Sequence, residues 1–180
     1  MLVSPLVRPR RLNLGCGRTR RQGYIGVDLY RGGAADILAL ADALPFRDGS
    51  FDEVYASHVL EHVPKIEDVI QEIHRILKPK GVLTAVVPYG LQGLLAAPTH
   101  IRAFGWDSFH IWTRDGCDLQ SNPLFATEHR AITNWRLPLM WHFRKYLGRI
   151  PLTSEDEVGR IRSRLPIWRR TELTVRLRKL

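Results

Sequence analysis

The chain has 180 residues, which is the length of a single α/β or α+β domain and too short for two full-sized domains with a linker. Because 44% of the residues are hydrophobic and 25% are charged, the chain can form an apolar core, and this composition excludes wholesale disorder. Residues 1–129 carry 14 basic and 14 acidic side chains, whereas residues 130–180 carry 13 and 4, so the net charge of +9 belongs to the C-terminal third. Such a surplus can attract phosphate or an anionic surface, or it can form a solvated face.

The most apolar stretches predict no membrane partner. Residues 1–11 contain no apolar run long enough for a signal peptide, and residues 81–98 are interrupted by polar residues and a proline. Cys16 and Cys117 are too few for a disulfide framework, and neither has the companion spacing of a metal site. We therefore expect a soluble, cytoplasmic protein with free thiols.

Four short strands are predicted in the N-terminal part of the chain. Residues 11–14 alternate apolar and polar side chains and run directly into a glycine turn, so they predict a strand followed by a tight loop. Residues 24–29 and 36–40 are rich in β-formers and are the second and third candidates. A turn signal at 48–50 precedes the alternating residues 51–57, which predict the fourth strand.

The period then changes to that of a helix. From Pro64 to Leu77, apolar residues recur at three- and four-residue steps, with Pro64 suited to a first helical position and Pro79 and Gly81 suited to the stop. Residues 82–87 form a nearly continuous apolar run, as expected for a buried strand.

Beyond Tyr89 the pattern is looser. Residues 106–114 allow a helix, and the alternation at 173–177 predicts a final strand with one apolar face. The aromatic side chains of 104–112 can form a lid that stacks on a flat ligand, or they can pack as core under a long loop.

Small and acidic residues follow the first three predicted strands. Gly15-Cys16-Gly17 lets the backbone approach a ligand, but a dinucleotide fingerprint is excluded because Arg20 stands at the third glycine position. Asp28 ends the second strand, where a carboxylate can accept hydrogen bonds from both hydroxyls of a ribose. Asp42 follows the third strand and can accept from an exocyclic amine. Each residue alone can also be an ordinary turn or loop residue, but their order along one sheet edge favours a nucleotide-like ligand.

Five segments together resemble the successive motifs of the class I S-adenosylmethionine-dependent methyltransferases. They are residues 12–17, 26–29, 41–46, 50–63 and 72–81. The resemblance implies a compact α/β fold with a Rossmann-like, mostly parallel sheet and an antiparallel C-terminal strand. It also implies one methyltransferase domain over 1–180, with 10–90 as the cofactor-binding half and 91–180 as the acceptor side with its basic C-terminus.

The same resemblance implies where S-adenosylmethionine binds. The glycine turn lies against its methionine end, Asp28 holds the ribose, Asp42 with Ala43 brackets the adenine, and Ser57 with His58 lies beside the sulfonium. His62, one helical turn after His58, can face the same site, whereas Glu61 is interpreted as structural. The complete implied set is Asn13, Gly15, Cys16, Gly17, Asp28, Leu29, Asp42, Ala43, Leu44, Ser57, His58 and His62.

Three features depart from the family pattern. Asn13 stands where the family usually has an acidic residue, and Thr19 stands where it usually has a third glycine. Only residues 18–24 separate the glycine turn from the second strand, whereas a parallel crossover normally takes about a dozen residues or more. We therefore expect the first crossover helix to be missing, as in a shortened subgroup of the family.

The reaction that the resemblance implies needs little besides positioning. Displacement at a sulfonium methyl has a good leaving group, so holding the reacting atoms in line provides most of the acceleration, and no metal is required. A hydroxyl or protonated amine as acceptor also needs a general base, for which histidine is suited. The candidates are His58 and His100, and Tyr89, His100 and Trp106 are candidates for acceptor binding.

Two alternatives concern function. A small-molecule acceptor is marginally favoured over RNA because no recognition domain is appended, whereas RNA is favoured by the basic C-terminal residues Arg169, Arg170, Arg176, Arg178 and Lys179 near Trp168. The other class is a non-catalytic protein that keeps only the nucleotide site or the fold, which Asn13, Thr19 and the missing helix support. The acceptor's identity and the oligomeric state stay open.

Overall fold

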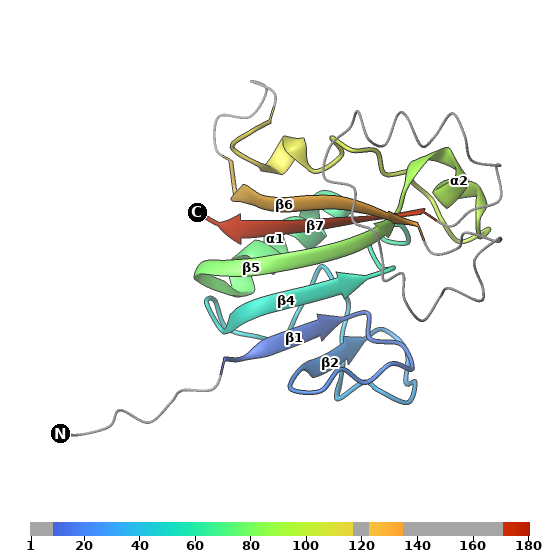
Figure 1. Cartoon of the computed structure of the whole chain (residues 1–180). Coiled ribbons are helices and arrows are strands. Elements are labelled where there is room, and N and C mark those ends of the chain that lie inside the picture. The colour runs from blue at the N-terminus through green and yellow to red at the C-terminus, as the bar shows by residue number, and fades with distance from the viewer. Residues whose placement is uncertain (1–8, 117–122, 135–170) are drawn as a thin grey trace, which may run out of the picture.

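A seven-stranded sheet organises the chain (Figure 1). The computed structural model describes residues 9–116, 123–134 and 171–180. In spatial order β3-β2-β1-β4-β5-β7-β6, the strands are Ile37–Leu38, Ile25–Asp28, Arg11–Leu14, Phe51–Ser57, Leu77–Pro88, Thr171–Lys179 and Phe125–Asn134. The pairs from β3 to β5 are parallel, and β7 runs antiparallel to both β5 and β6. The predicted α/β sheet with an antiparallel C-terminal strand is confirmed.

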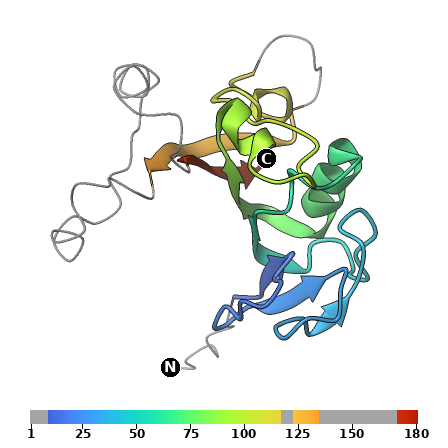
Figure 2. The same ribbon diagram turned by 90° about the vertical axis from the view of Figure 1, so that its right-hand side faces the viewer.

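One amphipathic helix, α1 (Ile66–Ile76), covers one face of this sheet (Figure 2). Its buried side chains are Ile66, Val69, Ile70, Ile73 and Ile76, and they belong to the same core cluster as the sheet residues Leu12, Val54 and Leu83. Burial of an aliphatic side chain of this size contributes about 1.5–3 kcal/mol. Packing on the sheet, more than helix propensity, therefore stabilises this short helix.

The ends of α1 differ from the prediction. Lys65 is the N-cap, so the helix begins at Ile66 and not at Pro64. At its other end the chain passes directly into β5 at Leu77, so Pro79 and Gly81 lie within that strand and do not stop the helix. The pairing of β4 with β5 jumps from Phe51↔Leu77 to Glu53↔Val82, and this irregularity accommodates the proline.

The connections from β1 to β4 contain turns and no helix. Residues 15–24, 29–36 and 39–50 are all described, and none of them is helical, so the predicted loss of the first crossover helix is confirmed. The third strand is shorter than predicted, with only Ile37 and Leu38 paired.

Side chains take the place of a helix on the other face of β1 and β4. The guanidinium carbon of Arg21 lies 4.0 Å from the ring centroid of Tyr55 and 4.8 Å from that of Tyr24. The hydroxyl of Tyr24 donates to Glu53 Oε1 at 2.8 Å, which fixes the ring over the sheet. The loop that replaces the crossover helix therefore folds back on the sheet through a stack of one guanidinium and two aromatic rings.

The aromatic stretch after β5 is mostly core. Phe104, Phe109 and Trp112 are 2%, 1% and 6% exposed, which favours the core hypothesis for these three side chains over the lid. The helix expected at 106–114 is reduced to the 3₁₀ helix η1 (His110–Trp112), and the short helix α2 (Gly90–Leu95) was not predicted. Within the described ranges, no helix has the length and apolar character that a membrane span requires.

Candidate functional site

The carboxyl ends of β1, β2, β4 and β5 lie at one edge of the sheet, and most of the predicted site residues follow these ends directly. The glycine turn after β1 has both glycines in the left-handed region, with φ of 63° at Gly15 and 54° at Gly17. A Cβ on Gly15 would lie 2.1 Å from Val59 Cγ2, whereas a Cβ on Gly17 would have nothing within 4 Å. Gly15 thus permits close packing of the β4 loop, and Gly17 leaves its side open for a ligand.

Asp28 connects the end of β2 to the glycine turn. The Gly17 N–H donates to Asp28 Oδ2 at 2.7 Å, and the Tyr30 N–H donates to Oδ1 at 3.0 Å. Each carboxylate oxygen has two acceptor positions, so one on each oxygen remains for a further donor. The carboxylate is therefore held in place by the backbone while keeping the capacity to accept two hydroxyls.

Asn13 and Cys16 are buried and stabilise the glycine turn. Asn13 is 6% exposed and its Nδ2 donates to Thr19 O at 3.3 Å. Cys16 is buried, its N–H donates to Val27 O at 3.1 Å, and burial raises the pKa of its thiol. The side chains of Asn13 and Cys16 support the loop. At these two positions only backbone groups can therefore contact a ligand.

The segment after β3 is held against α1. Asp42 and Ala43 are exposed, whereas Leu44 is buried and its N–H donates to Glu72 Oε1 at 2.7 Å. Leu29, which directly follows Asp28, is 52% exposed. Asp42, Ala43 and Leu29 therefore present their side chains to the exterior near the edge.

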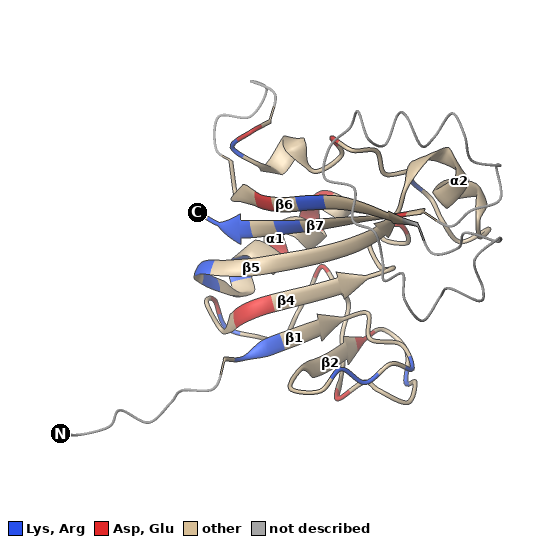
Figure 3. Ribbon diagram, viewed as in Figure 1, with Lys and Arg blue, Asp and Glu red and all other residues tan. Residues whose placement is uncertain are grey.

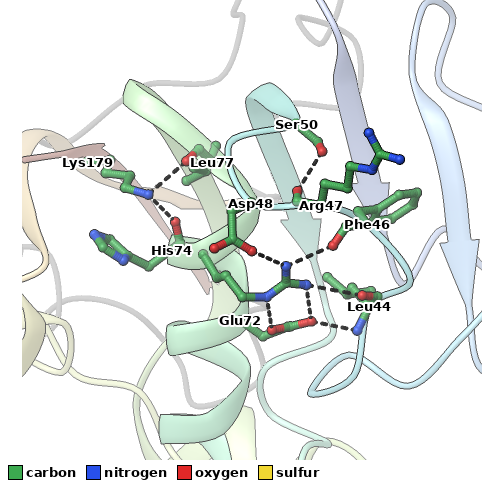
Figure 4. A network of polar contacts seen from close by, with 10 residues as sticks. Leu44, Phe46, Arg47, Asp48, Ser50, Glu72, His74, Leu77 and Lys179 are labelled. Carbon is green, nitrogen blue, oxygen red and sulfur yellow. Dashed lines mark hydrogen bonds and ion pairs between the residues drawn. The ribbon is translucent and has the colours of Figure 1, made fainter.

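Arg75 is the centre of this attachment, and its partners Leu44, Phe46, Asp48 and Glu72 are labelled in Figure 4. Its Nε and Nη2 donate to the two oxygens of Glu72 at 2.8 Å each. Its Nη1 donates to Phe46 O at 2.8 Å and to Asp48 Oδ1 at 2.6 Å, and Nη2 also donates to Leu44 O at 3.2 Å. The hydrogen bonds from Arg75 lower the pKa of Glu72. Sequence reasoning did not single out this pair, although its three-residue spacing on a helix is a usable signal.

His58 follows Ser57, the last residue of β4, in a left-handed conformation with φ of 56°. Its Nε2 lies 2.9 Å from Glu172 Oε1 and its Nδ1 lies 3.2 Å from Glu61 Oε1. Carboxylates accept hydrogen bonds, so both ring nitrogens donate. The contact with Glu172, followed by that with Glu61, raises the pKa of His58 to about 9. His58 is therefore an imidazolium at neutral pH, and an imidazolium does not accept a proton.

The structure groups His62 with His100 instead of with His58. Residues 60–62 form a turn, so His62 is not one helical turn after His58 as expected. The rings of His62 and His100 meet edge to face with centroids 4.8 Å apart.

The other two acceptor candidates lie farther along the chain. Tyr89 directly follows β5, where it pairs with Phe104, and the Trp106 ring is partly buried with the Arg130 guanidinium carbon 5.6 Å from its centroid.

Residues 12–85 match the protein family described as "Methyltransferase domain". Among curated proteins, the chain is 39% identical over 70 residues to the mitochondrial 2-methoxy-6-polyprenyl-1,4-benzoquinol methylase of Bos taurus, covering 39% of this chain and 19% of that protein. It is also 39% identical over 64 residues to sterol 24-C-methyltransferase ERG6B of Gibberella zeae, covering 33% of this chain and 17% of that protein. The chain therefore matches less than a fifth of the length of these two relatives.

Solved structures share the fold over nearly the whole chain. A SAM-dependent methyltransferase from Thermotoga maritima superposes with a TM-score of 0.64 at 18% identity, covering 98% of this chain and 84% of that chain. A SAM-dependent methyltransferase from Methanosarcina mazei has a TM-score of 0.61 at 15% identity, covering 100% and 99%.

Proposed function

Residues 12–85 belong to the class I S-adenosylmethionine-dependent methyltransferase family, as predicted, and on this premise we propose that the chain transfers a methyl group from S-adenosylmethionine to a small-molecule acceptor. The observation that carries the proposal is Asp28, whose two carboxylate oxygens are anchored by Gly17 N–H and Tyr30 N–H at the carboxyl edge of the sheet. The open side of Gly17 and the exposed Asp42 and Ala43 support the same assignment.

The residues present fit this cofactor. In our proposal Asp28 accepts the ribose hydroxyls, the backbone of the glycine turn meets the methionine end, and the segment from Asp42 to Leu44 flanks the adenine. S-adenosylmethionine, when bound, supplies an electrophilic methyl group. Ser57 ends β4 and the imidazolium of His58 follows it, and in our proposal the acceptor approaches from this side.

His100 is a better candidate for contact with the acceptor than His58. Both ring nitrogens of His58 donate to carboxylates, so it serves as a fixed cation. His100 uses Nδ1 to contact Gly93 O at 2.5 Å, and its Nε2 makes no hydrogen bond with the described residues. We therefore propose His100, with Tyr89 and Trp106, for the acceptor side.

Two observations favour a small molecule over RNA as acceptor. The two curated relatives are named for a benzoquinol and a sterol, both small molecules. Of the basic C-terminal residues, Arg176 and Arg178 on β7 form ion pairs with Glu128 on β6. Basic and acidic residues are both present on these two neighbouring strands (Figure 3). Lys179 Nζ donates to His74 O and Leu77 O at 2.6 and 2.8 Å. Trp168, Arg169 and Arg170 lie outside the described residues.

The test is a calorimetric titration of the full chain with S-adenosylhomocysteine, together with thermal unfolding. Ligand at a hundredfold excess over its dissociation constant stabilises the fold by about 2.7 kcal/mol, or roughly 5–10 °C for a chain of this size. Asp28→Asn should abolish this shift. Asp36→Asn is the matched control, because Asp36 Oδ2 also accepts a backbone N–H, from Gly26 at 2.8 Å, without being a proposed cofactor residue.

The outcomes separate the two function classes. Binding that Asp28→Asn removes and Asp36→Asn retains supports the proposed cofactor site, and an acceptor screen with His100→Ala follows. No binding at millimolar ligand contradicts the proposal and favours the non-catalytic alternative.

A further inference from the structure

Glu61, His62 and His100 bring one ligand atom each within 4.8 Å of one another, beside the proposed cofactor site. We propose that these three side chains bind a divalent transition-metal ion, with Zn²⁺ as the best match to two imidazoles and one carboxylate. This inference goes beyond the proposed methyl transfer, and metal binding can be measured without cofactor or acceptor. His100 Nε2 contacts the acceptor only in the metal-free protein, because a bound ion takes up its lone pair.

The Nδ1 of each histidine contacts a backbone carbonyl, which leaves Nε2 as the nitrogen that can bind a metal. His62 Nδ1 lies 3.1 Å from Thr99 O, and His100 Nδ1 lies 2.5 Å from Gly93 O. A carbonyl oxygen only accepts, so in the neutral ring Nδ1 carries the proton and Nε2 has the lone pair that can bind a metal. A backbone carbonyl that orients the other ring nitrogen is the usual outer-shell partner of a metal-binding histidine.

The carboxylate has an oxygen that the described residues leave unsatisfied. Glu61 is fully buried, and its Oε1 accepts from His58 Nδ1 at 3.2 Å. Its Oε2 is buried and has no hydrogen-bond partner among the described residues. A buried carboxylate oxygen without a donor is costly, and a cation next to it removes that cost. Glu61 was interpreted from the sequence as structural, and the unpartnered oxygen gives it a second role.

The two segments that carry the ligands are connected by one backbone hydrogen bond and by the side chain of Arg102. Ile101 N–H donates to Glu61 O at 3.0 Å, and Arg102 Nη2 donates to Val63 O at 2.6 Å and Pro64 O at 3.0 Å. These bonds place His100 beside His62 although they are 38 positions apart in the sequence. The site is therefore largely preorganised before any ion binds.

Only a small rearrangement completes the coordination. Ligand atoms around a tetrahedral ion with bonds of about 2.1 Å lie about 3.4 Å apart. The ring of His62 is exposed, so its ligand nitrogen can move by the up to about 1.4 Å that separates 4.8 Å from this distance. Three protein ligands leave at least one position open for water or an oxygen of a bound molecule, as in catalytic zinc sites.

The experiment is a titration of the full chain, first dialysed against a chelator, with Zn²⁺ by calorimetry and with Co²⁺ by visible absorption. We expect one ion per chain and the d–d bands of a four-coordinate cobalt site. His62→Ala and His100→Ala should each weaken binding by at least the roughly 10- to 100-fold that loss of an outer-shell partner causes. His129→Ala, which replaces an exposed histidine of β6, is the control and should bind as the wild type does.

Two results would overturn the proposal: no Zn²⁺ binding by the folded wild-type chain, or binding that survives the double variant His62→Ala/His100→Ala. His62→Ala changes an exposed side chain and so keeps the test valid if Glu61→Gln, which alters a buried carboxylate, fails to fold. Neither titration contains S-adenosylhomocysteine, so a negative result for metal binding does not contradict the methyltransferase proposal. That proposal is tested separately by the titration with S-adenosylhomocysteine.

Discussion

The guanidinium of Arg75 attaches the proposed adenine-side loop to α1, so Arg75→Ala should weaken both the fold and the cofactor site. The variant loses two hydrogen bonds to Glu72, one each to Leu44 O and Phe46 O, and one to Asp48. The side chain of Glu72 is 14% exposed and that of Asp48 is 82% exposed. The contact with Asp48 therefore contributes little, and the loss comes mainly from Glu72 and the carbonyls.

The loss of stability expected for Arg75→Ala follows from the groups that lose their hydrogen bonds to the guanidinium. Removing one member of a buried ion pair costs about 3–5 kcal/mol, and Arg75 lies at or below the low end of this range because its side chain is 33% exposed. We expect about 3 kcal/mol less free energy of unfolding, or a Tm lower by roughly 6–12 °C. Arg75→Lys keeps the charge but not the planar fork, so it should recover only part of the loss.

Urea unfolding of the full chain measures this effect, and calorimetry with S-adenosylhomocysteine measures its consequence for the loop. The control is Arg47→Ala, in the same loop, where the exposed side chain makes no hydrogen bond with the described residues. If Arg75→Ala and Arg47→Ala unfold at the same urea concentration, the network does not hold the loop and the reasoning fails.

The ion pair between Arg75 and Glu72 predicts that the free energy of unfolding depends on pH. Hydrogen bonds from Arg75 lower the pKa of Glu72 below its ordinary value of 4.5, so the unfolded chain binds more protons in the acid range. This stabilisation is present above pH 4.5 and is lost as the pH falls through the folded-state pKa. The stability difference between wild type and Arg75→Ala should therefore shrink on acidification. A constant difference would contradict the assignment of the effect to this ion pair.

Two further pairs of substitutions test features of the fold by urea unfolding. Gly15→Ala should cost about 2–4 kcal/mol because of its positive φ and its clash with Val59, whereas Gly17→Ala should cost only about 1 kcal/mol of backbone strain; equal losses would show that contact with Val59 is not decisive. Arg21→Ala should cost about 1 kcal/mol by removing the cation–π stack on Tyr55, and Tyr55→Phe, which keeps the ring, should cost much less. If Tyr55→Phe is as damaging, the stack is not what stabilises this face.

The strands and the helix with a clean periodicity could be predicted, whereas β6 could not. Residues 51–57 follow a turn signal and form β4 with the predicted bounds, and burial alternates along the strand from Glu53 to Ser57. In β6 the polar residues Glu128, His129 and Arg130 stand together, and the pairing register with β7 shifts between Thr127 and His129. A bulge moves the side chains that follow it to the other face, so alternation is lost in the sequence although the strand is continuous.

Sequence reasoning assigned α1 correctly, and its end lies one residue from the predicted Leu77, but the start of β5 at that residue was not predicted. Pro79 and Gly81 are ordinary helix-stop signals, yet the chain has already left the helix at Leu77 and pairs with Phe51. Pairing with a strand that is distant in sequence decided the boundary, and local propensity does not report such contacts.

The chemistry of the histidines depends on partners that no local motif contains. His58 lies within a recognisable segment, but Glu172, which is 114 residues away, accepts from its Nε2 and is the larger cause of its raised pKa. His62 has His100 as its neighbour because the segment after α2 folds back on the turn after β4. A motif places a side chain at the edge of a sheet, but the protonation state and ligand capacity of that side chain follow from the long-range contacts. For this reason His58 becomes a fixed cation, while His62 and His100, with Nε2 of each still available, become the candidates for binding chemistry.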